Sequence, residues 1–411
     1  MIAKTARREF SRSMRFEEGR GAMLPRGTGE GGRLLYLHVP FCESLCTYCS
    51  FNRVLLDESL SRRYFAALRK EMSLYRERGY NFQGIYVGGG TPTILMDELQ
   101  ATLSHARACF GIREISVETN PNHLTAHNLE DLQRARVNRL SVGIQSFDDG
   151  LLKAMGRYNS YGSGDEIRDR LIKARGYFDT LNADMIFNFP IQTEETLARD
   201  IDILKETEVD QVTYYPLMVS DSTRSAVERT LGRVDYGKEQ DFYRLISGRL
   251  TPRYRFSSAW CFSRKDAIID EYIVDYDDYA GLGSGSIGYL DGRCYANTFY
   301  IPEYIERLER GELPLMASRD FSLRDRIRYD FVMKLFGMDL NLNALQEKYG
   351  RRAFFYLFAD IAAFLGAGGL RYSGGALHLT SRGRYYWVIM MREFFTAVNN
   401  FRDFCLKARG V

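Results

Sequence analysis

Three cysteines within eight residues, Cys42, Cys46 and Cys49, are the side chains of this sequence best suited to chemistry. They directly follow the apolar run from Tyr36 to Phe41, which is typical of a buried strand. Thiolates are soft ligands that bind iron–sulfur clusters and zinc. A [4Fe–4S] cluster held by three thiolates leaves one iron open to an outside ligand, whereas structural zinc takes four protein ligands. The triplet therefore predicts an open metal centre.

Two other interpretations of the triplet stay open. One is a zinc site completed by a distant residue, although the chain lacks the second Cys-x-x-Cys or His-x-His pair that zinc modules usually supply. The other is three unrelated thiols. The remaining cysteines stand singly in apolar or aromatic surroundings, where a free cysteine behaves as a small hydrophobic residue: Cys109, Cys261, Cys294 and Cys405. We predict that these four are structural, with one of them as a hidden fourth ligand as the alternative.

Composition places the chain among globular proteins with a large core. It has 411 residues, 45% of them hydrophobic, and a net charge of +3. The first 30 residues hold seven Lys and Arg but no apolar run, so we predict a basic arm rather than a secretion signal, and a cytoplasmic location. Lys and Arg alternate with Asp and Glu, so no nucleic acid is expected. Asp360 interrupts the apolar stretch from Ala353 to Leu370, so no membrane span is expected either.

The first half of the chain alternates two kinds of segment. Runs rich in β-branched and aromatic residues predict six strands: Arg33–Val39, Gly84–Gly88, Glu114–Thr119, Arg139–Ile144, Asn182–Asn188 and Asp210–Leu217. Apolar spacing of three and four residues predicts helices between them: Leu60–Arg78, Asp97–Cys109, Ala126–Arg136, Asp149–Met155, Gly164–Phe178 and Glu194–Glu206. Strict alternation predicts an α/β fold with a parallel sheet, whose ligands gather at the carboxyl ends of the strands.

After about Ser220 the alternation stops and a second unit is expected. Aromatic strands are predicted around Tyr254–Cys261, and a glycine-dense turn at Gly281–Gly288. Helices, a hairpin through two glycines and a last helix follow: Leu323–Lys334, Leu342–Tyr349, Ala353–Phe364, Gly374-Gly375, and Arg384 to about Asn400. This order is typical of a winged-helix-like module, which we interpret as a packing or substrate-covering unit.

Polar residues follow the predicted strands where each one ends. The turn Gly88-Gly-Gly-Thr-Pro-Thr93 closes the second strand, Glu118 and Gln145 end the third and fourth, and Asp184 lies in the fifth. Three successive glycines let a backbone approach a ligand closely. Each residue taken singly has an ordinary explanation as a cap or turn residue. Together they predict one pocket, because the carboxyl ends of neighbouring parallel strands converge.

These motifs resemble the radical S-adenosylmethionine superfamily, and within it the oxygen-independent coproporphyrinogen III oxidase branch. Four segments carry the resemblance: the Cys-x3-Cys-x2-Cys triplet, the Gly-Gly-Gly-Thr-Pro-Thr turn, Glu118-Thr-Asn-Pro121, and Arg139-Leu-Ser-Val-Gly-Ile-Gln-Ser-Phe147. It runs from about Arg33 through the Gly281–Gly288 turn and Cys294-Tyr-Ala-Asn297 to Leu379-Thr-Ser-Arg-Gly383, and so covers most of the chain.

The resemblance implies a partial six-strand (β/α) barrel of the TIM type with a C-terminal helical, winged-helix-like domain. It implies a [4Fe–4S] cluster on Cys42, Cys46 and Cys49, whose open iron binds S-adenosylmethionine, one or two molecules in all. An electron from the reduced cluster would cleave that cofactor to methionine and a 5′-deoxyadenosyl radical. By the same resemblance, Tyr36 flanks the cofactor, and Gly89, Gly90 and Thr91 contact its amino group. The rest of the cofactor site is lined by Glu118, Gln145, Arg157 and Asp184. Ile287 would lie near a second S-adenosylmethionine.

The chain departs from both kinds of relative that share these motifs. Ser50-Phe51-Asn52-Arg53 differs from the Gly-Cys-Asn of the oxidases, whose Tyr-rich entry motif is also missing. The related haem chaperones share Phe51 and Asn52 but carry His-Asn-x-x-Tyr-Trp before the glycine turn, where this chain has Tyr272-Ile-Val-Asp-Tyr276. His378 is predicted to be an ordinary strand residue rather than a haem ligand.

The leading hypothesis is a radical enzyme that acts on a tetrapyrrole or similar planar aromatic, either by methyl transfer and anaerobic haem degradation or by oxidase-like chemistry. An electron donor such as flavodoxin or ferredoxin is the implied partner. The alternative is a haem-binding chaperone without catalysis, and a third class is a zinc-stabilised binding module. The predicted division is a basic arm (1–30), a barrel (31–220), a barrel extension with the glycine turn (221–300) and a C-terminal domain (301–411).

Overall fold

Six parallel strands form the centre of the molecule, as the alternating pattern predicts. The computed structural model describes residues 2–13, 16–18, 24, 26–27, 32–265 and 272–407. The six strands neighbour one another in chain order: β2 (Arg33–Val39), β5 (Gly84–Gly89), β6 (Glu114–Thr119), β7 (Arg139–Gln145), β8 (Thr180–Phe187) and β9 (Gln211–Pro216). The α/β fold class with a partial barrel is therefore confirmed.

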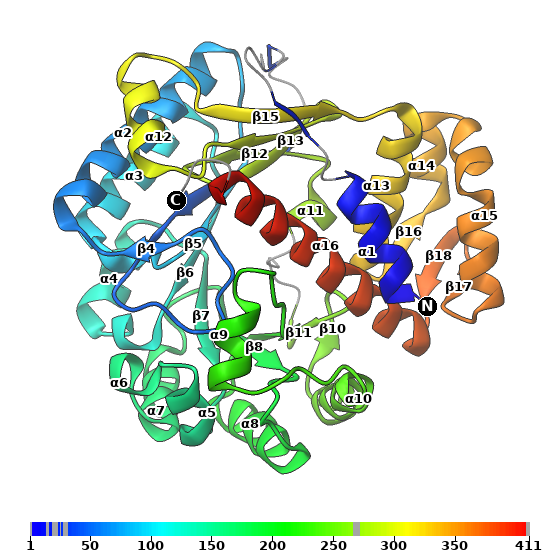
Figure 1. Ribbon diagram of the computed structural model, residues 1–411, viewed down its shortest axis with the longest axis horizontal. Coiled ribbons are helices and arrows are strands. Elements are labelled where there is room, and N and C mark those ends of the chain that lie inside the picture. The colour runs from blue at the N-terminus through cyan, green and yellow to red at the C-terminus, as the bar shows by residue number, and fades with distance from the viewer. Residues whose placement is uncertain are drawn as a thin grey trace.

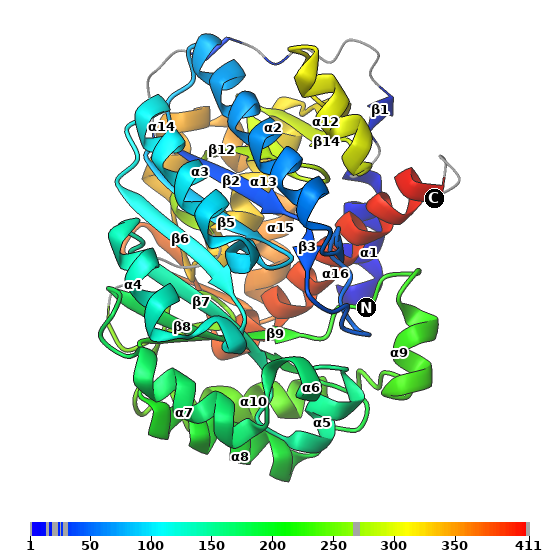
Figure 2. The same cartoon turned by 90° about the vertical axis from the view of Figure 1, so that its left-hand side faces the viewer.

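Helices connect these strands and cover the outside of the curved sheet (Figures 1 and 2). They are α2 (Glu58–Glu77), α3 (Met96–Cys109), α4 (Ala126–Arg134), α5 (Asp149–Ala154), α6 (Tyr158–Tyr161), α7 (Gly164–Ala174) and α8 (Glu194–Thr207), with short 3-10 turns η1 (Pro92–Ile94) and η2 (Pro121–His123). Capping decides their ends. Helix α2 starts before the predicted Leu60, because the Asp57 side chain accepts the Leu60 amide at 2.9 Å. Helix α7 ends before the predicted Phe178, because Gly176 has φ +80°.

The sheet extends beyond the six strands on both sides, to thirteen strands in the described part of the chain. Beside β2 lie β12 (Asp278–Leu282), β13 (Ile287–Leu290), β14 (Arg293–Asn297), β15 (Leu315–Asp320) and β1 (Glu17–Glu18); beside β9 lie β11 (Cys261–Ser263) and β10 (Arg255–Phe256). The predicted glycine turn is thus a strand connection whose ends lie in β12 and β13. The predicted division of the chain into four parts stays a prediction.

The C-terminal unit contains the predicted helices and hairpin. Its elements are α13 (Leu323–Phe336), α14 (Leu342–Tyr349), α15 (Arg352–Gly366), α16 (Ser381–Lys407) and a small sheet of β16 (Asp339–Asn341), β18 (Ala376–Leu379) and β17 (Leu370–Ser373). Gly374 and Gly375, both with positive φ, form the turn between β17 and β18. The connecting helices are α9 (Arg224–Thr230), α10 (Glu239–Leu250), α11 (Tyr272–Asp275) and α12 (Ile301–Glu309).

Several helices were not predicted: α9, α10 and α12 after Ser220, and one helix near the start of the chain. Within the basic arm, α1 (Ile2–Ser13) packs along α16, with the Phe10 and Phe394 rings 5.4 Å apart and Arg7 paired with Glu393 at 2.6 Å (Figure 1). Ile2, Ala6 and Phe10 recur every four residues, which is a helical spacing that the charge of the arm obscures.

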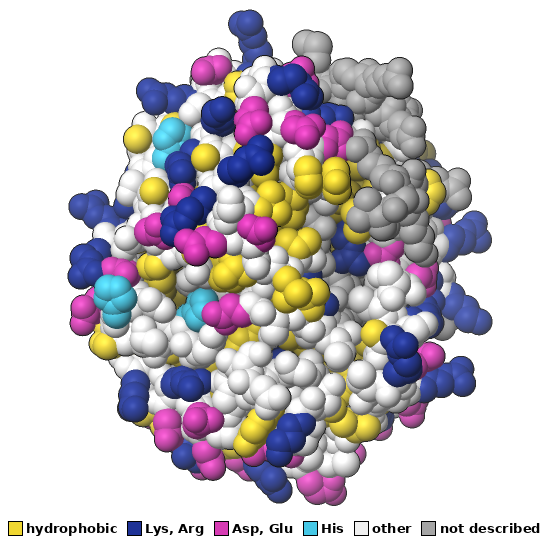
Figure 3. Space-filling model, turned by 60° about the vertical axis from the view of Figure 1, so that its left-hand side comes forward, with side chains coloured by type: hydrophobic (Ala, Val, Ile, Leu, Met, Phe, Trp, Pro, Cys, Tyr) yellow, Lys and Arg dark blue, Asp and Glu magenta, His cyan; other side chains and the backbone are white. Residues whose placement is uncertain are grey.

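The surface carries both signs of charge. Basic and acidic side chains alternate over the face in Figure 3, among scattered hydrophobic ones. Among the described residues, no helix is both long enough and apolar enough to cross a membrane.

Candidate functional site

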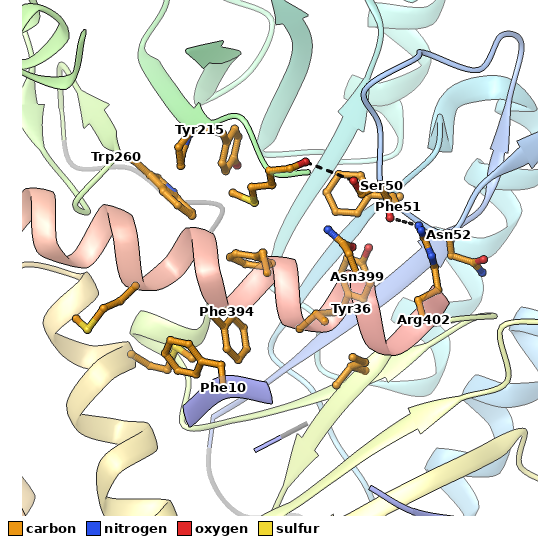
Figure 4. Close-up of a pocket in the computed structure, with 18 of the residues that line it drawn as sticks. Phe10, Tyr36, Ser50, Phe51, Asn52, Tyr215, Trp260, Phe394, Asn399 and Arg402 are labelled. Carbon is orange, nitrogen blue, oxygen red and sulfur yellow. Dashed lines mark hydrogen bonds between the residues drawn. The ribbon is translucent and has the colours of Figure 1, made fainter. Parts of the chain in front are cut away.

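A cavity of about 1180 Å³ lies at the carboxyl ends of the parallel strands. Its walls come from the loop that carries the cysteine triplet, from β2 and β5 to β9, from β13 and β14, and from α1, α13, α15 and α16. Figure 4 shows α16 crossing this space, with Trp260 and Tyr215 on one side of it and Phe10 and Phe394 on the other. Ligand pockets for drug-sized molecules usually enclose ~300–1,000 Å³, so this cavity has room for a large ligand.

The three cysteines line this cavity: Cys42 ends β3 (Phe41–Cys42), and Cys46 and Cys49 lie on the loop that leads to β4 (Val54–Leu55). All three are free thiols, and Cys42 and Cys46 are each 7% exposed. Burial, followed by the nearby Cys49 thiol, raises the pKa of Cys42 to about 12. Burial also raises the pKa of Cys49. A metal that binds here must displace these protons, so bound metal and folded loop stabilise each other.

Two arginines bring positive charge to the triplet. Arg157, 3% exposed, donates from Nη1 to Cys46 Sγ at 3.3 Å and from Nη2 to Asn120 Oδ1 at 3.2 Å, and stacks 4.2 Å from the Tyr161 ring. Arg53 donates from Nη2 to the carbonyl oxygens of Cys46 at 2.6 Å and Cys49 at 2.9 Å.

Neither guanidinium is fully satisfied. The Nε atoms of Arg157 and Arg53 are buried without a hydrogen-bond partner, and neither arginine pairs with a carboxylate of the described residues. A buried cation without an anion is costly. The site therefore fits anionic groups: thiolates on a cluster beside both arginines, and a ligand carboxylate beside Arg157.

The glycine turn after β5 fits closely under the cysteine loop. A Cβ at Gly90 would lie 2.5 Å from the Phe41 carbonyl oxygen and 2.9 Å from Cys42 Sγ, so only glycine fits there. The amides of Gly90 and Thr91 donate to Val39 and Phe41 carbonyls at 2.7 and 2.8 Å. Thr91 is 1% exposed and lies behind the cavity wall, where its hydroxyl accepts from Asn120 at 2.8 Å.

Predicted acidic and amide side chains line the same wall. The Glu118 carboxylate accepts from the Gly89 amide at 3.0 Å and from Tyr86 Oη at 2.7 Å. Asp184 accepts from Ser141 at 2.6 Å and Asn182 at 2.8 Å. Gln145 sits at a bulge between β7 and β8 with φ +73°, a strained backbone that turns its side chain at the strand end.

Tyr36 and Ile287 complete the predicted set. Tyr36 stacks on Tyr86 with ring centroids 6.0 Å apart, and Ile287 begins β13. The structure thus brings eleven of the twelve predicted residues to one cavity, with Thr91 behind it: Tyr36, Cys42, Cys46, Cys49, Gly89, Gly90, Glu118, Gln145, Arg157, Asp184 and Ile287. Their predicted roles toward a cofactor stay predictions.

His38 was missed by the sequence reasoning. Its Nε2 lies 2.7 Å from the Asn52 carbonyl oxygen and therefore donates, so Nδ1 accepts from Tyr36 Oη at 2.9 Å. Burial lowers the pKa of His38 to about 4, which keeps the ring neutral. Its position two residues after Tyr36 on one strand was the available signal, because alternate residues share a face.

Glu71 on α2 was missed as well. Its fully buried carboxylate accepts from the Gly283 amide at 2.9 Å, Asn297 Nδ2 at 2.8 Å and Tyr304 Oη at 2.5 Å. Burial raises its pKa to about 7. Because it holds Gly283, Glu71 fixes the turn that leads into Ile287.

The last helix closes the cavity above the cysteine loop. Arg402 donates to the Ser50 carbonyl, as Figure 4 shows, and Asp403 accepts the Ser222 amide at 3.0 Å. Asn400 accepts the Asp221 amide at 2.9 Å. The Arg402 contact places α16 against the loop that carries the cysteines, and the other two hold it to the segment after β9.

The triplet is not a ready site for a single ion. Among the described residues, no three His, Cys, Asp or Glu side chains gather closely enough to hold one metal ion. A cubane offers a separate iron to each thiolate, so its ligands need not converge on one point. A cluster therefore fits this site better than a zinc ion does, given the three thiols, the two arginines and the close contact of Gly90 with the cysteine loop.

Comparisons with known proteins agree with this geometry. The family model described as "Radical SAM superfamily" matches residues 36–204. "Heme chaperone HemW" of Mycobacterium tuberculosis is 30% identical over 369 residues, 85% of this chain and 91% of that protein. The chain belongs to the radical SAM superfamily, in the family of the HemW heme chaperones and oxygen-independent coproporphyrinogen III oxidases. Membership implies a [4Fe–4S] cluster and S-adenosylmethionine as cofactors.

Other members of this radical SAM family are similar over most of their length. "Heme chaperone HemW" of Bacillus subtilis is 27% identical over 85% of this chain and 95% of that protein. "Oxygen-independent coproporphyrinogen III oxidase" of Pseudomonas aeruginosa is 24% identical over 85% of this chain and 82% of that protein. The solved coproporphyrinogen III oxidase of Escherichia coli superposes with TM-score 0.75 at 21% identity, over 94% of this chain and 93% of that one, and so shares the fold.

Proposed function

We propose that this protein is a radical SAM enzyme that acts on a tetrapyrrole or a similar planar aromatic substrate. The observation that carries the proposal is Arg157: a buried guanidinium that touches Cys46, has no carboxylate partner among the described residues, and keeps an unsatisfied Nε. It supplies a place for the carboxylate of S-adenosylmethionine beside the cluster. When bound, the reduced cluster and S-adenosylmethionine would supply a 5′-deoxyadenosyl radical.

The residues of the site have separate tasks in this proposal. Cys42, Cys46 and Cys49 would hold the cluster, and the backbone at Gly89 and Gly90 would lie beside it, where a bulkier residue would not fit. The fixed carboxylates of Glu118 and Asp184 can accept hydrogen bonds from an ammonium group and from ribose hydroxyls. The protein thus orients the cofactor and excludes water from it.

Aromatic side chains that line the cavity support a flat, apolar substrate. Trp260 and Tyr215 have ring centroids 5.2 Å apart, and Tyr289 stacks on Tyr329 at 4.6 Å and 29°. Aromatic walls of this kind favour planar ligands. Whether the reaction is methyl transfer with haem breakdown or oxidase-like chemistry depends on the substrate, and a second S-adenosylmethionine near Ile287 belongs to the same proposal.

A heme chaperone without catalysis is the second candidate, because relatives named heme chaperone are similar over most of this chain. Imidazole ligation has little support. Of the histidines, only His38 lines the cavity, and both its nitrogens are engaged. His378 lies on β18 and bonds to Asp339 and the Ser373 carbonyl. The side chains of Tyr272 and Ile273 and all of 266–271 lie outside the described residues.

The test is formation of 5′-deoxyadenosine by the anaerobically reconstituted, reduced protein with S-adenosylmethionine and a porphyrin or haem. We expect product above that of Cys46→Ala, and wild-type amounts from Cys109→Ala, whose thiol lies outside the cavity. Mass spectrometry of the tetrapyrrole then separates methylation from oxidation. Stoichiometric haem binding with no 5′-deoxyadenosine would favour the chaperone, and stoichiometric zinc without iron would refute both.

A further inference from the structure

Helix α15 exposes large apolar side chains on its outer face. Phe355 is 81% exposed, Phe358 74% and Leu365 39%, and Tyr372 on the adjoining β17 is 63% exposed. Phe355 and Phe358 are three residues apart on one helix and so lie side by side. Figure 1 shows α15 at the edge of the molecule, on the side away from α2 to α8.

Single exposed hydrophobic residues are common and need no explanation. This helix differs because its inner face is already buried: Ala353 and Leu357 are fully buried, and the Phe364 ring packs 4.9 Å from Trp387. The outer aromatic residues are therefore not needed for the core. A contiguous apolar patch of this kind usually marks a contact surface.

Arginines surround this patch. Arg351 and Arg352 at the start of α15 are exposed and form no ion pair with the described residues. Arg371 on β17 and Arg382 at the start of α16 are exposed too. Among the acids of this unit, Glu347 and Asp339 are exposed, but Asp339 pairs with His378, and Asp360 is neutralised by Arg328 at 3.0 Å. An apolar helix face with a basic rim matches the interface of a membrane that carries anionic headgroups.

We propose that the outer face of α15, with Phe355, Phe358, Leu365 and Tyr372 as its apolar part and Arg351 and Arg352 as its basic part, binds the surface of anionic membranes. A second copy of the chain is a poorer occupant, because a symmetric contact would place two surfaces with the same positive charge against each other. The surface also lies beside the cavity: Ala363 and Ala367 of the same helix are exposed and line it. A docked molecule would therefore hold this side of its cavity near the bilayer.

Co-sedimentation of the full-length protein with vesicles tests the proposal, using phosphatidylcholine alone and an equal mixture with phosphatidylglycerol. We expect binding to the anionic vesicles, weaker binding to neutral ones, and a loss of binding at high salt. Phe355→Ser/Phe358→Ser should weaken binding at least about tenfold, because inserted aromatic side chains supply the apolar part of interfacial affinity. Arg351→Glu/Arg352→Glu should remove the preference for anionic vesicles.

Phe404→Ser is the matched control, since Phe404 is 66% exposed on α16, away from this surface. It should bind as wild type does, and circular dichroism should show that all variants fold. Equal binding by wild type and the Phe355→Ser/Phe358→Ser variant, or no binding to anionic vesicles, would overturn the proposal. A stable dimer that dissociates only in the Phe355→Ser/Phe358→Ser variant would also overturn it, because the surface would then bind a second copy of the chain. None of these outcomes depends on the reaction in the cavity.

Discussion

Arg53 should raise the reduction potential of the cluster, and Arg53→Met should lower it. The guanidinium donates to the carbonyl oxygens of two cluster cysteines, Cys46 and Cys49, and forms no ion pair with a carboxylate of the described residues. Reduction adds one negative charge to the cluster, and a nearby cation stabilises the reduced state more than the oxidised one. Removing the cation therefore makes the cluster harder to reduce.

The size of this shift follows from the geometry. Arg53 Nη2 lies 2.6 Å from the Cys46 oxygen, and a cysteine's own sulfur lies a few Å beyond its carbonyl, so charge and thiolate are ~6 Å apart. With an effective dielectric constant of about 20 to 40 for a partly buried group, the interaction is ~1.4–2.8 kcal/mol. For a one-electron couple, ~1.4 kcal/mol corresponds to ~59 mV. We expect Arg53→Met to lower the midpoint potential by ~60–120 mV.

An anaerobic redox titration followed by electron paramagnetic resonance measures this potential. Arg53→Lys should retain most of it, because the charge remains, while Arg63→Met should leave it unchanged, since Arg63 on α2 is exposed and pairs with Glu309. Equal iron content in all variants must be checked first. If Arg53→Lys and Arg53→Met shift the potential equally, hydrogen bonding rather than charge is responsible. An unchanged potential in Arg53→Met would show the reasoning to be wrong.

Two further predictions concern residues around the cluster. Gly90→Ala should prevent incorporation of the cluster, because the new Cβ would lie 2.5 Å from the Phe41 carbonyl oxygen. Gly248→Ala is the control and should bind the normal amount of iron, because its Cβ would meet no atom within 4 Å. A normal iron content in Gly90→Ala would contradict this prediction. His38, whose pKa burial lowers to about 4, stays neutral in the folded state. As pH falls from 6.5 to 4 only the unfolded state gains this proton, so wild type should lose up to ~3 kcal/mol of stability that His38→Gln does not lose. Thermal melts over this pH range, with the exposed His127→Gln as control, should show that difference; parallel curves for wild type and His38→Gln would exclude it.

Local patterns were enough to place the parallel strands, because each is a short β-branched or aromatic run followed by a turn. They also placed the residues at the strand ends, since a parallel sheet brings those ends to one edge. Short strands were harder. Strands β13 and β14 have four and five residues and pair around glycine turns, so their sequence alone indicates a loop. Their pairing depends on β12 and β15, which no local window contains.

The site was predictable where its residues are close in sequence and not where they are distant. The cysteine triplet and the turn Gly88–Thr93 are local motifs, whereas Arg402 reaches Ser50 across 352 positions. Glu71 likewise meets Gly283 across 212 positions. A buried carboxylate on a helix looks like any other helical glutamate until the fold places backbone amides around it. Such partners are set by packing, which the spacing of the sequence does not encode.

The C-terminal unit is part of the site rather than a neighbour of it. Helix α16 packs at one end through Trp387, whose indole donates to the Val332 carbonyl at 2.9 Å, and at the other end it meets the cysteine loop through Arg402. Ser50, the residue that Arg402 holds, directly follows Cys49. Any movement that opens the roof of the cavity must therefore also release the loop that carries the ligands. Because one helix makes both contacts, exclusion of water and the geometry of the cluster loop depend on each other.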